Sequence, residues 1–156
     1  IFKFHNDLDT DQIIASQYLL LPNLDEMKGH TFESLDPDFA KKVKPGDFVV
    51  GGENFGCGSS REQAPEIIKA LGIQCVIAKS FARIFFRNSI NNGLLLIEQP
   101  DLHDDIKEGD EVTVVMNEHV DYNGKQYPIA SLPENLMDII QAGGLVKAMR
   151  KLNGLD

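Results

Sequence analysis

The hydrophobic positions of this chain form short apolar runs separated by turns that contain glycine or proline. Four of these runs predict β-strands, at 1–4, 47–50, 75–78 and 94–97. Between the last three runs, residues 64–72 and 81–91 predict two helices, the second capped by Ser80. The order from 47 to 97 is strand, loop, helix, strand, helix, strand, which predicts parallel strands with helices packed against them.

The N-terminal part of the pattern is less regular. Residues 11–14 predict a further strand, and 37–43 a short helix capped by Asp36. The connection 19–44 has weak periodicity throughout. Long connections of this kind often form lids or binding loops, so we predict a mobile substrate-specificity loop there.

The last third of the chain changes character. Residues 112–116 predict a strand, and 120–129 a hairpin that turns at Asn123-Gly124. Residues 133–142 and 145–152 predict two closing helices. Phe81, Ile84, Phe85 and Ile90 are predicted core positions of the earlier 81–91 helix by their spacing.

Composition and charge restrict the classes of function. The 156 residues, 42% of them hydrophobic, predict one soluble domain spanning 1–156. A net charge of −9, without a basic stripe, argues against nucleic acid as a partner. No apolar run approaches the about 20 residues of a membrane span, and the N-terminal residues lack a signal-peptide pattern. An anionic substrate must therefore be held by local cations rather than by the overall field.

The cysteines and histidines are few and scattered. Cys57 and Cys75 are too few for a disulfide framework and fit a reducing cytoplasm, where we expect the protein to work. They also cannot hold an iron–sulfur cluster, which typically takes about three or four thiolates. The four histidines form no metal-binding pair, so we expect no metal bound by this chain.

The stretch with the clearest chemistry is 51–63, which reads GGENFGCGSSREQ. It follows a predicted strand and leads into a predicted helix. Unpaired N–H groups at a helix N-terminus favour an anion, and Ser59, Ser60 and Arg61 fall at that point. A site for a small anionic molecule is therefore one interpretation. The alternative is a tight turn in which Ser59 or Ser60 only caps the helix.

Two blocks at a specific spacing resemble a known family: GENFGCGSSREQAP, and KSFARIFFRNSINNGLLLIE after it. Together with DTDQII at residues 9–14, they resemble the small subunits of 3-isopropylmalate dehydratase and, more broadly, the swivel domain of the aconitase superfamily. The resemblance covers nearly the whole chain. It implies an α/β fold of the swivelling β/β/α type, a layered sheet with flanking helices.

The resemblance also implies a partner. In this family the small subunit works with a large subunit that carries a [4Fe–4S] cluster, as a heterodimer or heterotetramer. The small subunit closes over the substrate. The implied reaction removes and re-adds water across a C–C bond of a hydroxy-dicarboxylate.

Site residues are carried over from the family motif. Ser59 is the implied base, Arg61 binds a substrate carboxylate through its planar fork, and Ser60 and Gly58 contact substrate. Asp11 orients the serine or helps to deprotonate it. The alternatives are a helix cap for Ser59, a surface ion pair for Arg61 and an ordinary turn residue for Asp11.

The apolar stretch Tyr18, Leu19, Leu20 and Leu21 bears on the substrate. Enzymes of the superfamily that act on tricarboxylates have an arginine in this region, at the position that aligns with Leu20. A leucine packs against an isopropyl group but cannot pair with a carboxylate. The stretch therefore favours isopropylmalate over citrate or homocitrate. The alternative is that all four residues belong to the core.

Three further residues qualify this interpretation. Arg83 and Arg87 lie four apart on the 81–91 helix and are candidates to support the site or to pair with the partner. Cys57 is a weak nucleophile candidate because no histidine lies near it in sequence. Gln63 stands where the family motif most often has histidine, and glutamine cannot titrate, which counts against a proton-carrying role there.

The sequence thus predicts a small subunit of 3-isopropylmalate dehydratase, in leucine biosynthesis. Two alternatives remain open. One keeps the chemistry and changes the substrate: a homoaconitase or a methylmalate-type hydro-lyase. The other is a dicarboxylate-binding domain without catalysis.

Overall fold

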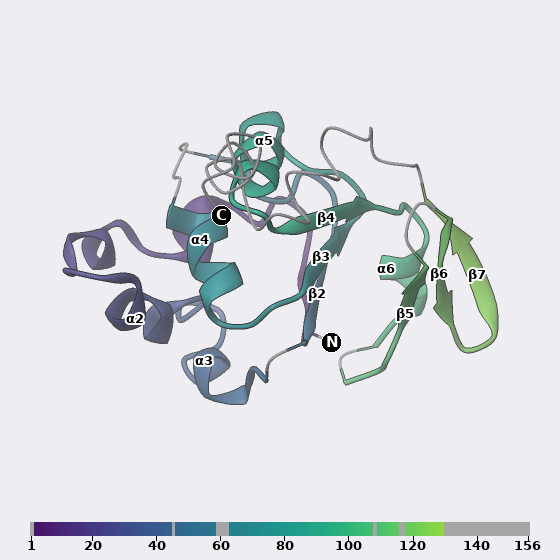
Figure 1. Ribbon diagram of the computed structural model, residues 1–156, viewed down its shortest axis with the longest axis horizontal. Helices are drawn as coiled ribbons and strands as arrows, with labels where there is room; N and C mark the ends of the chain where they lie inside the picture. Colours follow the sequence, from purple (N-terminus) through teal and green to yellow (C-terminus); the bar gives the residue numbers. More distant parts are fainter. Residues whose placement is uncertain (1, 45, 59–62, 108, 116–117, 130–156) are drawn as a thin grey trace, which may run out of the picture.

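A four-stranded parallel sheet lies at the centre of the computed structural model, which describes residues 2–44, 46–58, 63–107, 109–115 and 118–129 (Figure 1). Its strands stand side by side in chain order: β1 (Phe2–Lys3), β2 (Phe48–Gly51), β3 (Cys75–Ala78) and β4 (Leu95–Glu98). Each neighbouring pair is parallel. The four predicted strands are confirmed, as is the parallel arrangement predicted for the three strands within 47–97, and the bounds of β3 coincide with the prediction.

Alternate residues of the central strands face two separate cores. Val49, Val76 and Leu96 are aligned across the sheet and belong to the first core. Their neighbours along the strands, including Val50 and Ile77, belong to the second. Because both faces of the sheet are covered, the strands are apolar at nearly every position, as buried parallel strands are.

Two long helices cover the first face. α4 (Gln63–Ala70) and α5 (Arg83–Asn91) connect β2 to β3 and β3 to β4. α5 begins after Ala82 without a side-chain cap, so the predicted cap at Ser80 is wrong: its hydroxyl accepts the Asn54 amide at 2.8 Å. Ile84 was predicted to be core but is 57% exposed.

The second face is covered by α6 (Leu102–Asp105) and a three-stranded antiparallel sheet. That sheet contains β5 (Thr113–Val115), β6 (His119–Tyr122) and β7 (Lys125–Pro128). Asn123 and Gly124 both have positive φ, 50° and 78°, which confirms the predicted hairpin turn. Helix, parallel sheet and antiparallel sheet thus form the predicted β/β/α layers (Figure 1). The predicted helices at 133–142 and 145–152 lie outside the described residues.

The segment after β1 contains a helix where a strand was expected. α1 (Thr10–Ile13) replaces the predicted strand at 11–14. Asp9 caps it: its carboxylate accepts the Gln12 amide at 2.8 Å, while the Gln12 side chain accepts the Asp9 amide at 3.1 Å. This reciprocal capping box stabilises the first turn and outweighs the strand preference of Ile13 and Ile14.

The connection 19–44 is built from short helical pieces. They are η1 (Ser16–Leu20, which starts just before it), α2 (Leu24–Met27), η2 (Lys28–His30) and α3 (Phe39–Lys42). The helix predicted at 37–43 is shorter, and Asp36 does not cap it: Asp38 takes that position without a side-chain bond. Phe32 and Phe39 are buried and pack against each other in the first core. Mobility of this connection stays a prediction.

Helix α5 contains a buried polar atom that finds no partner among the described residues. The Ser89 hydroxyl is fully buried and makes no hydrogen bond with that part of the chain. A buried, unsatisfied hydroxyl costs about 1–3 kcal/mol, and alanine also favours helix more than serine does. Ser89→Ala is therefore expected to raise the free energy of unfolding by about 1 kcal/mol in urea titrations. Ser89→Val also removes the hydroxyl but adds volume, so comparing the two variants separates loss of the hydroxyl from repacking. A destabilised alanine variant would contradict the expectation.

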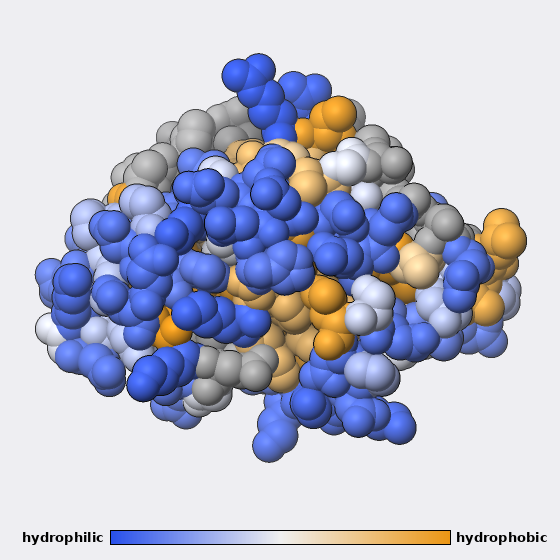
Figure 2. Space-filling view, turned by 180° about the vertical axis from the view of Figure 1, so that it is seen from behind, coloured by the Kyte–Doolittle hydropathy of each residue, from blue (hydrophilic) through white to orange (hydrophobic). Residues whose placement is uncertain are grey.

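The exterior is mainly hydrophilic, in keeping with the net charge of −9. Seen from behind, hydrophilic side chains cover most of this face, and hydrophobic ones show near the middle, near the top and at the right margin (Figure 2). No helix in the described part of the chain is long and apolar enough to cross a membrane.

Candidate active site

The glycine-rich turn after β2 lies against the acidic segment after β1. The Asp7 amide donates to the Glu53 carbonyl at 2.7 Å and the Gly56 amide to the Leu8 carbonyl at 2.7 Å. Asp9 and Cys57 form an isolated parallel bridge. Two stretches more than forty positions apart in the sequence, 5–10 and 52–58, are thus joined along their backbones.

Glycine is required where this turn crosses its neighbours. A Cβ at Gly52 would meet the Asn6 side chain and lie 2.9 Å from the Asn6 backbone nitrogen. At Gly56, where φ is +85°, a Cβ would lie 2.6 Å from the Phe85 Cβ of α5. Contacts this short exclude any side chain, so the turn depends on close backbone approach on two sides.

The predicted catalytic residues Ser59 and Arg61, and the predicted substrate-binding residue Ser60, lie outside the described residues. Gly58 precedes them, with φ of +92°, and Gln63 follows as the first residue of α4. The strand predicted before the motif and the helix predicted after it are therefore both present. The roles of the three residues stay predictions, as does the contact of Gly58 with substrate.

Asp11 lies next to this turn. It is exposed, in the first turn of α1, and the preceding residue, Thr10, donates its amide to the Cys57 carbonyl at 2.9 Å. The predicted neighbourhood of Asp11 and the glycine turn is thus present in the backbone. Its part in activating a serine stays a prediction.

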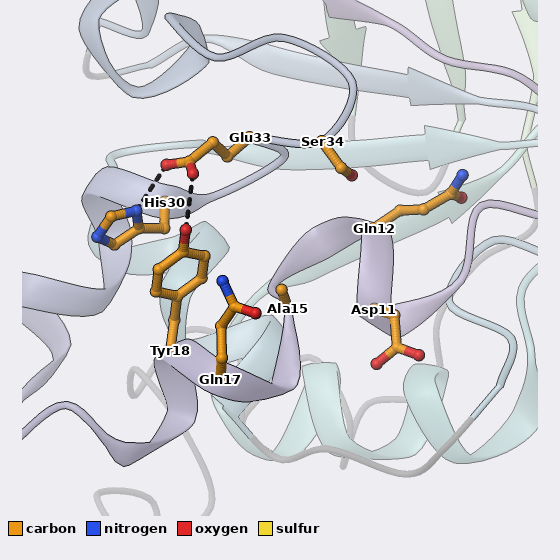
Figure 3. Close-up of a pocket in the computed structure, with 8 residues that line it drawn as sticks. All are labelled: Asp11, Gln12, Ala15, Gln17, Tyr18, His30, Glu33 and Ser34. Atoms are coloured by element: carbon orange, nitrogen blue, oxygen red, sulfur yellow. Dashed lines mark hydrogen bonds and ion pairs between the residues drawn. The ribbon is translucent and has the colours of Figure 1, made fainter.

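A cavity of about 210 Å³ opens beside Asp11 (Figure 3). Its walls come from α1, from η1 and the residue before it, and from η2 and the turn after it. The lining side chains are polar with few exceptions: Asp11, Gln12, Ala15, Gln17, Tyr18, His30, Glu33 and Ser34. Asp11 and Tyr18 were predicted site residues, and the fold brings both to this cavity.

Three side chains of the cavity form a cluster that the sequence pattern did not reveal. The Tyr18 hydroxyl donates to Glu33 Oε1 at 2.8 Å, and His30 Nδ1 lies 2.6 Å from Glu33 Oε2. Hydrogen bonding by His30, and then by Tyr18, lowers the pKa of Glu33. A histidine and a glutamate three apart were the available signal, but such pairs are common on protein surfaces.

The predicted substrate-binding stretch divides into residues with different surroundings. Leu20 is 89% exposed, whereas Leu21 is half-buried against Ile14, Met27 and Ile67. The interpretation that the whole stretch is core is therefore wrong for Leu20, whereas Leu21 is partly buried against a cluster of core residues. The Leu19 side chain lies outside what the structure describes.

Arg83 and Arg87 are exposed on α5. Neither lines the cavity beside Asp11. Support of the site by these arginines stays a prediction, as does their pairing with a partner.

The surroundings of both cysteines disfavour the thiolate, the form that acts as nucleophile and metal ligand. Burial raises the pKa of Cys57, with Asp9 and Asp7 adding to the effect, and burial raises the pKa of Cys75 strongly. Cys75 lies inside the second core, while Cys57 lies in the glycine turn. Two such thiols do not fit an iron–sulfur cluster, which takes about three or four thiolates. Within the described ranges, no three acidic, histidine or cysteine side chains are grouped to hold a metal ion.

Comparison with known proteins connects this geometry to a family. The aconitase C-terminal domain matches residues 10–102. Over all 156 residues the chain is 67% identical to the 3-isopropylmalate dehydratase small subunit of Lachnospira eligens, covering 95% of that protein. The chain belongs to the isopropylmalate dehydratase small-subunit family. The resemblance predicted from the motifs is confirmed, and Gln63 does not remove the chain from this family.

Further members of the small-subunit family agree along the same length. The small subunit 1 of Archaeoglobus fulgidus 3-isopropylmalate dehydratase is 53% identical over 97% of this chain and 95% of its own length. The isopropylmalate/citramalate isomerase small subunit of Methanocaldococcus jannaschii is 48% identical over 97% of this chain and 92% of its own. A crystal structure of 3-isopropylmalate dehydratase from M. jannaschii superposes with a TM-score of 0.92 at 44% identity, covering 99% of this chain and 93% of that one.

Proposed function

We propose that this chain is the small subunit of a 3-isopropylmalate dehydratase, a hydro-lyase of leucine biosynthesis that interconverts 2-isopropylmalate and 3-isopropylmalate. The observation that carries the proposal is identity of 67% along the whole chain to a protein of that name. The joined backbone of the glycine turn and the acidic segment supports it, because it brings the backbone next to Asp11 into contact with the turn that precedes the serine–arginine motif in the sequence.

The chain would supply acid–base and binding groups, while a large subunit would carry the [4Fe–4S] cluster, the Lewis acid of the reaction. Ser59 would take the proton next to a substrate carboxylate, with Asp11 orienting it. Arg61 would hold a carboxylate by two parallel hydrogen bonds. Ser60 and the Gly58 backbone would line the same position. We expect the assembled enzyme in the cytoplasm, as a heterodimer or heterotetramer.

The exposure of Leu20 favours a substrate that carries an apolar branch. A leucine that is 89% exposed has its side chain available for contact with another molecule. Burying an isopropyl group against it would contribute about 2 kcal/mol, whereas a carboxylate there would be left without a partner.

A second candidate function follows from one relative's name. The M. jannaschii protein that is 48% identical is named for both isopropylmalate and citramalate. Citramalate has a methyl group where isopropylmalate has an isopropyl group. Each CH₂ is worth about 0.8 kcal/mol on burial, so one apolar site would bind both, the isopropyl compound more tightly.

Reconstitution with the cluster-bearing large subunit tests the proposal. Turnover of 2-isopropylmaleate, 2-methylmaleate and homoaconitate would be compared by the ultraviolet absorbance of the conjugated double bond. We expect the isopropyl compound to have the highest kcat/KM, and either subunit alone to be inactive. Preference for homoaconitate would indicate a homoaconitase. Failure to recruit any cluster-bearing partner would favour a binding domain without catalysis.

Leu20→Arg is expected to change substrate selectivity. The variant loses apolar contact and gains a cation, so kcat/KM for 2-isopropylmaleate should fall about 30-fold while that for homoaconitate rises. Leu35→Arg is the matched control, since Leu35 is also an exposed leucine of the 19–44 connection. Unchanged selectivity at Leu20→Arg would remove this residue from substrate recognition.

A further inference from the structure

Tyr18, His30 and Glu33 meet at one carboxylate in the wall of the cavity (Figure 3). Each oxygen of Glu33 binds one ring: Oε1 accepts from the Tyr18 hydroxyl at 2.8 Å, and Oε2 lies 2.6 Å from His30 Nδ1. The two rings also stack on each other, with centroids 3.8 Å apart and planes inclined by 6°. The Glu33 carboxylate thus binds both rings of the stacked pair, one through each oxygen.

Glu33 is attached to the core through its neighbour. Phe32 is fully buried and donates its amide to the Ile13 carbonyl at 2.8 Å. The backbone position of Glu33 is therefore set by the first core and by α1. A side chain that binds Glu33 is therefore held in place relative to the first core and α1.

Tyr18 is the central residue of η1, and its backbone makes hydrogen bonds with residues on both sides of it in the sequence. Its amide donates to the Ala15 carbonyl at 3.0 Å, and its carbonyl accepts the Leu21 amide at 3.2 Å. A 3₁₀ helix is a weak element, and η1 has no side-chain cap at its start. Contacts of the Tyr18 side chain therefore have a large share in fixing the segment.

The residue that depends most on this arrangement is Leu20. It is two positions after Tyr18, and its side chain is 89% exposed, so the fold of this chain holds it through the η1 backbone. Leu21, next to it, packs against Ile14 and Met27 and gives the segment a second attachment. Tyr18 and Leu21 thus bracket Leu20.

We infer that Glu33 is a positioning residue for substrate selectivity: by binding Tyr18 and His30 it fixes η1 so that Leu20 meets the apolar branch of the substrate. The inference rests on the proposed function, because it assigns Leu20 to that branch. Glu33 itself would not touch the reacting atoms. Its loss should therefore weaken recognition of the branch more than it slows the chemical step.

Glu33→Gln tests this with almost no change in shape. The amide keeps one acceptor but cannot accept from both rings. In the reconstituted enzyme, KM for 2-isopropylmaleate is expected to rise about tenfold, the factor for losing one charge-assisted hydrogen bond. The preference for 2-isopropylmaleate over 2-methylmaleate should fall, because Leu20 is no longer held. A fall in kcat at constant KM would overturn the assignment.

Tyr18→Phe provides the second arm. It removes the hydroxyl and keeps the stacked ring, so it should shift KM in the same direction. If Glu33 acts through Tyr18, the double variant Y18F/E33Q should be no worse than the more impaired single variant. Fully additive effects would show that Glu33 acts by another route. Asp36→Asn is the matched control: its carboxylate also binds two partners, Lys42 Nζ at 2.9 Å and the Asp38 amide at 3.0 Å, but neither lies in η1.

Hydrogen exchange of the whole small subunit decides the positioning step without any assay of activity. In Glu33→Gln, the amides of Tyr18 and Leu21 should exchange about tenfold faster, while those of β3 stay unchanged. Unchanged exchange at both amides would overturn the inference even in an active enzyme. If the wild-type complex does not turn over 2-isopropylmaleate, the proposed function fails, and the exchange result still decides whether Glu33 fixes η1.

Discussion

Gly56→Ala is expected to lower the free energy of unfolding by about 3 kcal/mol or more, the largest effect on stability that we predict for a single substitution. Two costs add at this position. With φ of +85° the backbone is in the left-handed region, which disfavours alanine. The new methyl group would also lie 2.6 Å from the Phe85 Cβ, so α5 and the turn would have to separate. Urea unfolding followed by circular dichroism measures the loss.

Gly109→Ala isolates the first of these costs. Gly109 has φ of +91°, close to that of Gly56, but a Cβ there would meet nothing within 4 Å. Its replacement should cost only about 1 kcal/mol. Equal losses at Gly109 and Gly56 would mean that the approach of Phe85 to the turn contributes nothing.

Ser59→Ala is expected to lower kcat of the reconstituted enzyme about 1,000-fold, within the range of general base catalysis. The same change should cost only about 1 kcal/mol of stability, the value of a lost helix cap. Steady-state kinetics and urea unfolding of one protein preparation therefore separate the two roles. If Ser59 were only a cap, stability would fall by this amount and kcat would stay near the wild-type value.

Cys57→Ser is the control for that experiment. Cys57 lies in the same turn, and burial with two nearby aspartates raises its pKa, so its thiol is poorly suited to act as a nucleophile. Activity of the Cys57→Ser variant should stay within about twofold of wild type. A large loss at Cys57 together with full activity at Ser59→Ala would reverse the assignment.

The central layers of the fold were predictable because strong local patterns agree with the packing. In β3 all residues from Cys75 to Ala78 are buried, so a continuous apolar run marked the strand without ambiguity. Residues 11–14 were misassigned because Ile13 and Ile14 suggested a strand. The helix there depends on Asp9 and Gln12 capping each other, a signal that lies mostly upstream of the apolar residues.

The site was predictable only in part. The motif around Gly58 and the neighbouring Asp11 follow from sequence because the family resemblance names them. His30 and Glu33 do not, since their contacts with Tyr18 depend on a tertiary arrangement in which Phe32, between them in the sequence, is buried in the core. The exposure of Leu20 could not be predicted from the run of leucines either. The sequence pattern looks the same whether a leucine in such a run packs inward or faces outward.

The turn at 52–58 also has a consequence for the order of assembly. Its partners are the segment 5–10, synthesised before it, and residues 80–85, synthesised after it: the Phe55 amide donates to the Ser80 carbonyl at 3.0 Å, and Phe85 of α5 packs against Gly56. A growing chain that has reached residue 60 contains the whole turn at 52–58 but cannot yet close it. The turn can therefore take its final shape only when α5 has emerged from the ribosome. Recognition of a substrate or partner at this turn requires both halves of the chain.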